Sequence, residues 1–300
     1  PYAPLPPGYV VGSYVWAVEP TKDWALGQPN YNPLIRPGVQ QETLSVCMIV
    51  RSDGDTLAKT LRTVRAEADE IIVGITDDKK GPAWEICKRF RVKAFQMESP
   101  LEIGFAAARN KTIERASGDW ILWIDDDETL TWPQNLRKYL RPNPFTAYAV
   151  PHHHLAVEPL GLIKTDMPTR LFRNRRGVRF FGEVHEHPEF GLNKGLGLVY
   201  PLDDVSIAHN GYETELVRRA RFVRNLPLMR RDRELNPDRV LGKFLWARDL
   251  AQQNRFEFEQ FQRTTPVMWK RGEEVIALWR ELVLKHKDLR LVLDCLPYYS

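Results

Sequence analysis

Short apolar runs alternate with segments of helical spacing in the first half of the chain. The runs are almost wholly apolar, which is typical of strands buried on both faces of a parallel sheet. They cover residues 44–50, 70–75, 92–95 and 120–124. Between them, apolar residues at helical spacing predict helices over residues 56–68, 81–90 and 105–116. This alternation predicts an α/β fold with a parallel sheet and right-handed crossovers.

The last of these runs ends abruptly in four acidic residues, Asp125, Asp126, Asp127 and Glu128. Unpaired carboxylates are costly to bury, so we expect all four at the open edge of the sheet, where α/β proteins bind ligands. In an extended chain Asp125 and Asp127 point the same way. Two converging carboxylates suit a hard divalent cation, either Mg²⁺ or Mn²⁺. The alternative is an acidic strand-to-helix loop whose last acid caps a helix.

Polar residues also follow the first two strands of this region. Arg51 and Asp53 come after the first strand, and Thr76 and Asp78 come after the second. A dinucleotide-binding enzyme would carry Gly-x-Gly-x-x-Gly after the first strand, whereas this turn holds a single glycine, Gly54. The sequence therefore disfavours a dinucleotide enzyme.

Composition and charge narrow the class of protein. Hydrophobic residues make up 43% and charged residues 27% of the 300 positions, which is typical of a soluble globular protein. A net charge of +4 is too small to indicate nucleic-acid binding by itself. No apolar run approaches the roughly 20 residues of a membrane-spanning helix, and no signal peptide is visible. Cys47, Cys87 and Cys295 show no metal-binding or disulfide spacing, so we expect a cytoplasmic protein.

Residues 1–42 are rich in proline and aromatic residues and show no sustained helical period. Proline fixes φ and removes a hydrogen-bond donor, so little regular structure is expected there. Aromatic side chains such as Trp16 and Trp24 are costly to leave in water. We predict an extended arm, with an edge strand over residues 10–16, that packs on a later domain or joins two copies in a homo-oligomer. The alternative is a flexible leader.

Four segments carry a resemblance to a known family. They are Arg51-Ser52-Asp53, Ala68-Asp69-Glu70-Ile71-Ile72-Val73, Gly104-Phe105-Ala106-Ala107-Ala108-Arg109-Asn110 and the run from Gly118 to Glu128. On these segments the chain resembles a family 2 glycosyltransferase with the GT-A fold. The similarity covers roughly residues 44–210. One departure is that Ile75-Thr76-Asp77-Asp78 stands where the family usually has Asp-Thr-Gly-Ser.

The resemblance implies roles for residues of the first half. Asp78 would accept a hydrogen bond from a uracil-type base, Arg109 would contact the diphosphate, and Asp127 would bind a metal bridging both phosphates. Asp125 would contact the ribose or the metal, which is Mn²⁺ or Mg²⁺ and acts as a Lewis acid for the leaving group. The implied nucleotide-sugar contacts are Val50, Arg51, Asp53, Thr76, Asp78, Arg109, Asp125 and Asp126. For Arg109 the alternative is a salt bridge on a helix surface.

The second half of the proposed transferase domain, up to residue 210, carries clustered histidines. Three consecutive histidines, His152 to His154, alternate faces in an extended chain and cannot all bind one ion, so we expect a loop lining the acceptor cleft. Residues 169–174 and 178–187 suggest a hairpin ending in His185-Glu186-His187.

This segment also resembles the family, in its pattern Arg-Leu-Phe-Arg-Asn followed by Val-His-Glu. A sugar transfer with inversion needs one carboxylate to deprotonate the acceptor, and Glu186 is the candidate base. His185 would either complete the metal shell as a third ligand or contact the diphosphate. Asp166 and Glu183 are reserve candidates for the base. The alternative is that His185 and Glu186 only brace a loop.

Residues 211–300 are predicted to be helical. Helices are expected over residues 212–235, 237–253, 255–263 and 272–287, with a kink or break at Pro227. Family members often carry tetratricopeptide-like hairpins here, and this segment looks similar. The first helix contains Arg218, Arg219, Arg221, Arg224, Arg230, Arg231 and Arg233. These arginines form either a solvated face or a docking surface for an anionic acceptor.

The sequence thus predicts a metal-dependent inverting glycosyltransferase that uses a nucleotide-sugar, with a UDP-sugar favoured. Its acceptor would be a hydroxyl group on a saccharide, a protein or another macromolecule, nucleic acid included. One alternative is a catalytically silent scaffold that keeps only the fold. The other is a nucleotidyltransferase, which would want a glycine-rich phosphate loop after the first strand.

Overall fold

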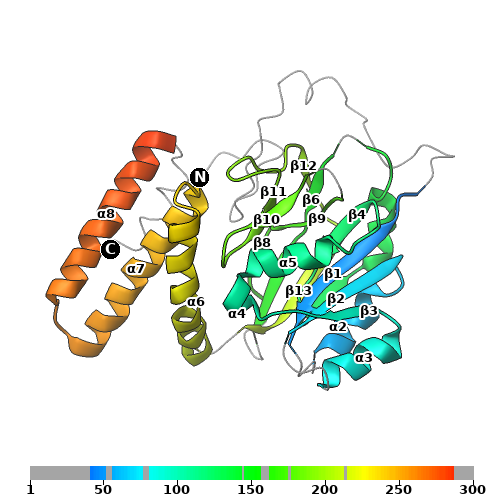
Figure 1. Ribbon diagram of the computed structural model, residues 1–300, viewed down its shortest axis with the longest axis horizontal. Coiled ribbons are helices and arrows are strands. Elements are labelled where there is room, and N and C mark those ends of the chain that lie inside the picture. The colour runs from blue at the N-terminus through cyan, green and yellow to red at the C-terminus, as the bar shows by residue number, and fades with distance from the viewer. Residues whose placement is uncertain are drawn as a thin grey trace. The chain divides into compact units, whose positions relative to one another are not determined.

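The computed structural model describes residues 41–51, 56–76, 81–143, 145–156, 162–174, 177–212 and 215–286. It forms two compact units (Figure 1). The first runs up to residue 181 and resumes over 186–214, and the second comprises residues 182–185 and the chain from 215 onward. The expected N-terminal arm and its edge strand over residues 10–16 lie outside the described residues.

A mixed, mostly parallel sheet forms the centre of the first unit, as the sequence predicted. Its strands lie in the order β12-β6-β9-β4-β1-β2-β3. The four strands β4, β1, β2 and β3 are parallel neighbours, and β9 runs antiparallel to β4 and β6. Their bounds are β1 Leu44–Val50, β2 Glu70–Ile75, β3 Lys93–Gln96, β4 Trp120–Trp123, β6 Ala147–Ala149, β9 Thr169–Arg173 and β12 Val199–Pro201.

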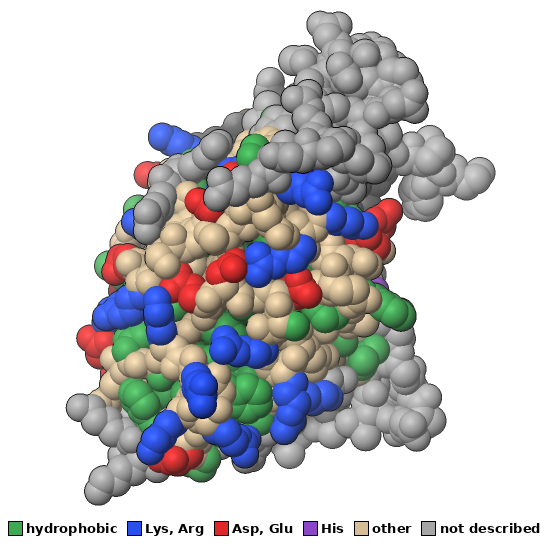
Figure 2. All heavy atoms as spheres, turned by 90° about the vertical axis from the view of Figure 1, so that its right-hand side faces the viewer, with side chains coloured by type: hydrophobic (Ala, Val, Ile, Leu, Met, Phe, Trp, Pro, Cys, Tyr) green, Lys and Arg blue, Asp and Glu red, His purple; other side chains and the backbone are tan. Residues whose placement is uncertain are grey.

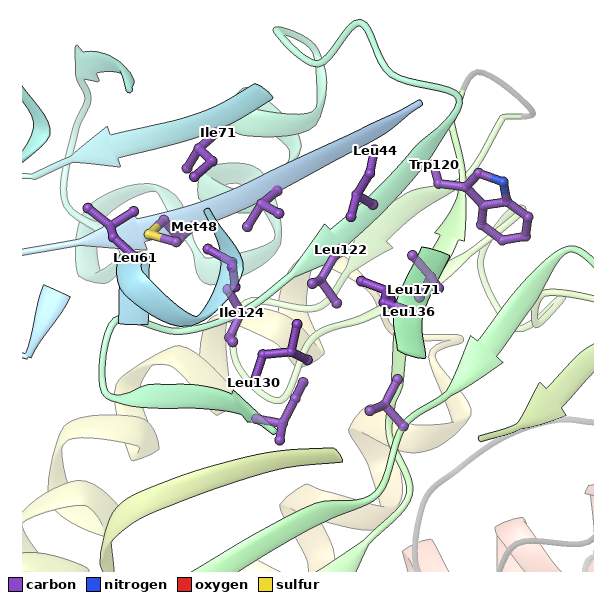
Figure 3. Close-up of a cluster of buried hydrophobic side chains, with 14 of the residues drawn as sticks. Leu44, Met48, Leu61, Ile71, Trp120, Leu122, Ile124, Leu130, Leu136 and Leu171 are labelled. Carbon is purple, nitrogen blue, oxygen red and sulfur yellow. The ribbon is translucent and has the colours of Figure 1, made fainter. Parts of the chain in front are cut away.

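Apolar side chains cover both faces of this sheet, which explains the continuous apolar runs. Alternate residues of β1 point to opposite faces, so Leu44 and Met48 join one core cluster while Cys47 joins the other. In β4, Leu122 belongs to the first cluster and Trp123 to the second. Figure 3 shows the first cluster gathered along β1 and β4.

Three of the helices around the sheet were predicted. They are α2 Leu57–Val64, α3 Pro82–Phe90 and α5 Phe105–Ile113. The short helix α4 (Pro100–Ile103) was not predicted, and it begins where the Ser99 side chain accepts a hydrogen bond from the Leu101 N–H. On the face that carries α5, Gly74 of β2 leaves no room for a side chain. An added Cβ would lie 2.3 Å from Met97 Sδ and 3.2 Å from Thr112 of α5.

A second, four-stranded sheet was not predicted. Its strands lie in the order β5-β13-β7-β8, and a separate antiparallel pair joins β10 to β11. Their bounds are β5 Glu128–Thr131, β7 His152–Ala156, β8 Leu162–Asp166, β10 Arg179–Phe181, β11 His187–Glu189 and β13 Ser206–Tyr212. A 3₁₀ helix, η1 (Pro133–Tyr139), follows β5.

Two expectations for this region were wrong. The histidines at 152–154 lie in strand β7 and not in a loop, because β7 pairs with β13 on one side and β8 on the other. Residues 169–174 and 178–187 do not form a hairpin, because β9 pairs with β4 and β6 whereas β10 pairs with β11.

The second unit contains three long helices. Their bounds are α6 Glu215–Leu235, α7 Val240–Phe261 and α8 Pro266–His286. The expected break at Pro227 is absent, since α6 continues through it. Pro227 is exposed, so water can satisfy the carbonyl group that proline leaves without a partner. The two helices expected over 237–253 and 255–263 are one helix, α7.

The surface carries charges of both signs. Figure 2 shows lysine and arginine side chains spread over the right-hand side of Figure 1, with acidic side chains among them. Such mixing is typical of a solvated face. Within the described part of the chain, no helix is long and apolar enough to span a bilayer.

Candidate functional site

The carboxyl ends of β1, β2 and β4 bring several predicted residues to one edge of the sheet. Val50 of β1 lies opposite Ile75 of β2, and the Thr76 N–H donates to the Val50 carbonyl at 2.9 Å. The Ile124 N–H donates to the Cys47 carbonyl at 3.2 Å, which places the start of the acidic segment beside β1. Arg51 directly follows Val50 at this edge. The predicted nucleotide-sugar contacts Asp53 and Asp78 lie outside the described residues.

The four acids do not form a row along an extended strand. The chain turns at Asp126 and Asp127, and β5 begins at Glu128. The Thr60 hydroxyl donates to the carbonyls of Asp126 and Glu128, at 2.7 and 2.6 Å, and the Asp125 N–H donates to Glu128 Oε2 at 2.9 Å. Asp125 and Asp127 are therefore not residues of one extended strand. Strand geometry gives no reason for their side chains to point the same way.

Glu128 is buried, contrary to the expectation that all four acids face ligand or solvent. Its side chain is 2% exposed and binds Arg170 Nη2 at 2.7 Å, and His152 Nε2 lies 2.9 Å from it. Burial alone would raise the pKa of Glu128, but Arg170, His152 and the Asp125 N–H outweigh it and hold the pKa well below its usual value. Burial lowers the pKa of His152, so its ring is neutral near pH 7. Pairing with Arg170 explains how this acid enters the interior.

Two buried arginines lie over the indole ring of Trp123. The guanidinium carbon of Arg170 lies 3.7 Å from the indole ring centroid, and that of Arg109 lies 4.2 Å from it. The indole N–H donates to the Thr169 carbonyl at 2.8 Å, which fixes the ring. Stacking on tryptophan stabilises a guanidinium group that has lost part of its hydration.

Arg109 links two of the predicted site residues. Its Nη2 donates to Asp125 Oδ1 at 2.9 Å, and its Nε donates to Glu186 Oε1 at 2.5 Å. Burial works against the charge of Arg109, but the two carboxylates outweigh it and raise its pKa. Arg109 is 6% exposed, so it is not the helix-surface ion pair considered from the sequence. Its guanidinium is directed at acids of the site.

A second partner of Asp125 is Arg170. Its Nη1 lies 3.9 Å from Asp125 Oδ2, and within the described residues neither Nη1 nor Nε of Arg170 has a hydrogen-bond partner. Arg170 was not among the predicted site residues. Arg170 is the first residue of the Arg-Leu-Phe-Arg-Asn pattern that carried the family resemblance. That pattern is the signal in the sequence that pointed to Arg170.

Three histidines from two strands gather beside the acids. The ring centroids of His152 and His154 are 4.3 Å apart, and each lies within 5.9 Å of His209 in β13. His153 points to the other face of β7 and its Nδ1 lies 2.8 Å from the Thr165 hydroxyl. The sequence excluded convergence of three consecutive histidines. It missed that the third ring comes from His209, which lies opposite His154 in the strand register.

Asp127 pairs with His209. Its Oδ2 lies 3.0 Å from His209 Nε2, which is the separation of neighbouring ligands bound at about 2.1 Å to an octahedral ion. Within the described ranges, no group of three or more His, Cys, Asp or Glu side chains could hold an ion. The predicted ligand set of Asp125, Asp127 and His185 stays a prediction, since His185 belongs to the second unit and the two aspartates to the first.

The reserve candidates for the base are both paired. His154 Nε2 lies 3.0 Å from Asp166 Oδ2 in the first unit. Glu183 belongs to the second unit, where Arg231 Nε donates to its Oε2 at 2.5 Å.

Comparisons with known proteins give one family match. Residues 45–175 match the model of the family described as Glycosyl transferase family 2. The chain is 33% identical over 159 residues to a TPR repeat-containing protein of Synechococcus elongatus, a match that covers 50% of this chain and 36% of that protein. It is 27% identical over 214 residues to the SPbeta prophage-derived glycosyltransferase SunS of Bacillus subtilis, which covers 69% of this chain and 49% of that protein. The chain thus spans half or less of the length of these relatives.

Among solved structures, the chain is similar to the mannosyltransferase PcManGT from Pyrobaculum calidifontis in complex with GDP-Man and Mn²⁺. The TM-score is 0.43 at 11% sequence identity, and the match covers 82% of this chain and 71% of that one.

Proposed function

We propose that this chain moves a sugar from a nucleoside diphosphate sugar to a hydroxyl acceptor with inversion. The premise of this proposal is that residues 45–175 match the model of glycosyl transferase family 2. The observation that carries the proposal is the cluster of acids and arginines at the carboxyl edge of the parallel sheet. A UDP-sugar is the favoured donor because the family resemblance gives Asp78 the role of a base contact. The acceptor is a saccharide, a protein or another macromolecule.

The proposed donor site uses the edge formed by β1, β2 and β4. Ligands of open α/β sheets bind at such an edge, outside the carboxyl ends of the strands. Val50, Arg51 and Thr76 lie along it, and Asp125 begins the segment after β4. Arg109 is occupied by Asp125 and Glu186, so its proposed role shifts from diphosphate contact to alignment of these two carboxylates.

A divalent cation, Mn²⁺ or Mg²⁺, is part of the proposal. Such ions bind through one or two protein ligands and complete their coordination with water and substrate phosphates. Asp127 and His209 supply a donor pair at a fitting separation, so His209 is a proposed ligand beside Asp127 within the first unit. When bound, the ion would act as a Lewis acid for the leaving nucleoside diphosphate.

Glu186 is the proposed base. A base for this reaction must reach the acceptor hydroxyl and carry its proton away. Arg109 binds one oxygen of Glu186, and the same guanidinium binds Asp125, so the proposed base has a fixed position relative to the proposed donor site. Asp166 and Glu183 remain the alternatives, each with a partner of its own.

The proposal is tested by screening nucleotide-sugars by thermal shift, with and without Mn²⁺, followed by a transfer assay. The true donor at 100 times its Kd should add about 2.7 kcal/mol to the free energy of unfolding. Asp127→Asn removes one charge from the proposed ion site and should abolish the stimulation of transfer by Mn²⁺. Asp204→Asn is a matched control, since Asp204 binds Lys138 and Tyr139, neither of which is a residue of the proposed site.

Two outcomes would contradict the proposal. Binding of a donor without hydrolysis or transfer under any metal would favour the catalytically silent scaffold. Unchanged dependence on Mn²⁺ in Asp127→Asn would refute the ion site. The transferase proposal would then depend only on the transfer measured in the assay.

A further inference from the structure

Helix α8 carries two apolar stripes, and its own unit covers only one of them. The covered stripe lies within the second unit, where α7 packs along α8 (Figure 1). It consists of Met268, Val275, Leu278, Trp279 and Leu282, all buried. The other stripe is exposed and consists of Trp269, Ile276, Val283 and Leu284. Trp269 is 68% and Leu284 76% exposed, so contact with another surface would remove a large apolar area from water.

The exposed stripe has the spacing of a seam between two helices. Trp269, Ile276 and Val283 follow one another at intervals of seven residues. Glu273 lies four residues after Trp269, and Arg280 lies four residues after Ile276. Positions that alternate by four and three residues lie along one side of an α-helix, as in the seam of a coiled coil. Both charged residues are exposed, so the seam presents one acid and one base among its apolar side chains.

The order of these charges identifies the partner. The stripe runs from Trp269 to Leu284, and Glu273 and Arg280 are equally far from its midpoint. If a second α8 packs antiparallel across a two-fold axis at this midpoint, Glu273 of each copy lies opposite Arg280 of the other. The same axis brings Trp269 of each copy opposite Leu284 of the other. A parallel pair would instead set each charge beside its own like, which is unfavourable.

We propose that the exposed stripe of α8 is an interface between two copies of this chain, packed antiparallel. A two-fold interface uses the same patch on both subunits, so the patch must be complementary to itself, and this one is. A strongly acidic or strongly basic partner would favour a seam of a single sign. The proposal concerns the second unit alone and does not depend on the sugar transfer proposed above.

The test measures self-association of the full chain by analytical ultracentrifugation. A single pair of helices makes a small interface, so we expect a monomer–dimer equilibrium with a Kd of about 1–100 μM. Glu273→Arg and Arg280→Glu each turn both ion pairs of the dimer into contacts between like charges. Each should raise the dimer Kd by about 10-fold or more. The two changes in one chain restore both pairs with their signs exchanged, and the Kd should return to near the wild-type value.

Mixing the two single variants gives a second measurement. Glu273→Arg has two positive side chains in the seam and Arg280→Glu has two negative ones, so the mixture should form a heterodimer more tightly than either variant forms a homodimer. Recovery of association on mixing also shows that both variants are folded, because an unfolded helix has no seam.

Ile276→Glu places a charge in the middle of the seam and should weaken the dimer as the single reversals do. Val267→Glu is its matched control. Val267 is exposed on the same helix but comes two residues before Trp269, on another side of the helix, so this variant should dimerise like the wild type.

Two results would overturn the inference. If the wild-type chain stays monomeric up to about 300 μM, which exceeds the expected Kd, the stripe binds something other than a second copy. If the chain dimerises but neither the charge reversals nor Ile276→Glu weakens the dimer, the contact between the copies lies elsewhere on the chain.

Discussion

At the scale of single residues, the site depends on guanidinium groups shared among several acids. Arg109 binds Asp125 and Glu186, and Arg170 binds Glu128 and approaches Asp125. Both stack on Trp123. Removing one acid therefore leaves its arginine with a second acidic partner. Variants of these acids can be compared because no buried arginine loses all of its counter-charges.

Glu186→Gln is the variant that examines the base. Glutamine keeps the shape and can still bind Arg109 through its oxygen, but it cannot accept the acceptor proton. We expect donor affinity to stay near the wild-type value and transfer to fall by about 10²- to 10⁴-fold. The measurements are donor binding by calorimetry and single-turnover transfer.

Asp166→Asn and Glu183→Gln are the matched controls for Glu186→Gln, since each removes a carboxylate that has its own partner. Neither should reduce transfer comparably. If donor binding falls together with the rate in Glu186→Gln, Glu186 is a donor or metal residue. If neither falls, the base lies elsewhere.

At the scale of the elements, Glu128 joins the two sheets of the first unit. It directly follows the turn after β4, and its backbone pairs with His209 of β13. Its side chain binds Arg170 of β9, in the large sheet, and lies beside His152 of β7, in the smaller one. One buried carboxylate thus connects the strand ends that carry the proposed site.

Glu128→Gln should destabilise the first unit and change its response to acid. Losing the charge removes the closest counter-charge of buried Arg170 and leaves Asp125 at 3.9 Å, so the cost should be below the roughly 3–5 kcal/mol of a fully uncompensated buried charge. The folded-state pKa lies below the unfolded value of about 4.3, so this stabilisation is present above that pH and is lost as pH falls through the folded pKa. The variant should therefore lose less stability than the wild type as pH falls below about 4.3 toward the lower folded-state pKa of Glu128.

Urea unfolding at pH 7 and at a series of lower pH values measures both effects. Glu98→Gln serves as a control, because the Glu98–Lys111 pair lies on the surface and should matter little. If the variant is as stable as the wild type at pH 7, or loses stability as steeply in acid, the Glu128 charge does not stabilise the first unit.

The sequence predicted the elements whose signal is local. Strands β1, β2 and β4 were found because both of their faces are buried, which gives continuous apolar runs. Strands β5 and β7 were missed because Glu128 and His152 to His154 interrupt any apolar pattern. Their strand character comes from pairing with β13, some 50 to 80 residues later in the chain. The same limit applies to the candidate site: Asp125 and Arg109 were named from the sequence, but neither their ion pair nor the contact of Glu128 with Arg170, 42 residues away, was predicted.

At the scale of the whole molecule, the net charge of +4 is small, but many arginines lie in one helix, α6. Several arginines of α6 bind acids within the second unit: Arg231 binds Glu183, Arg233 binds Glu274, and Arg219 lies 3.7 Å from Glu259. Three other arginines of the same helix, Arg221, Arg224 and Arg230, are exposed, and an anionic acceptor that docks on α6 would meet them.

Reversing those charges tests the hypothesis. If the three arginines hold an anionic acceptor, kcat/KM for that acceptor should fall as salt rises, while hydrolysis of the donor by water should be nearly insensitive to salt. The triple variant Arg221→Glu, Arg224→Glu and Arg230→Glu should lower kcat/KM at low salt and flatten its dependence on salt. Arg62→Glu with Arg89→Glu, on exposed positions of α2 and α3, changes the net charge in the same direction and is the control. Equal salt dependence of transfer and hydrolysis in the wild type would instead assign these arginines to a solvated face.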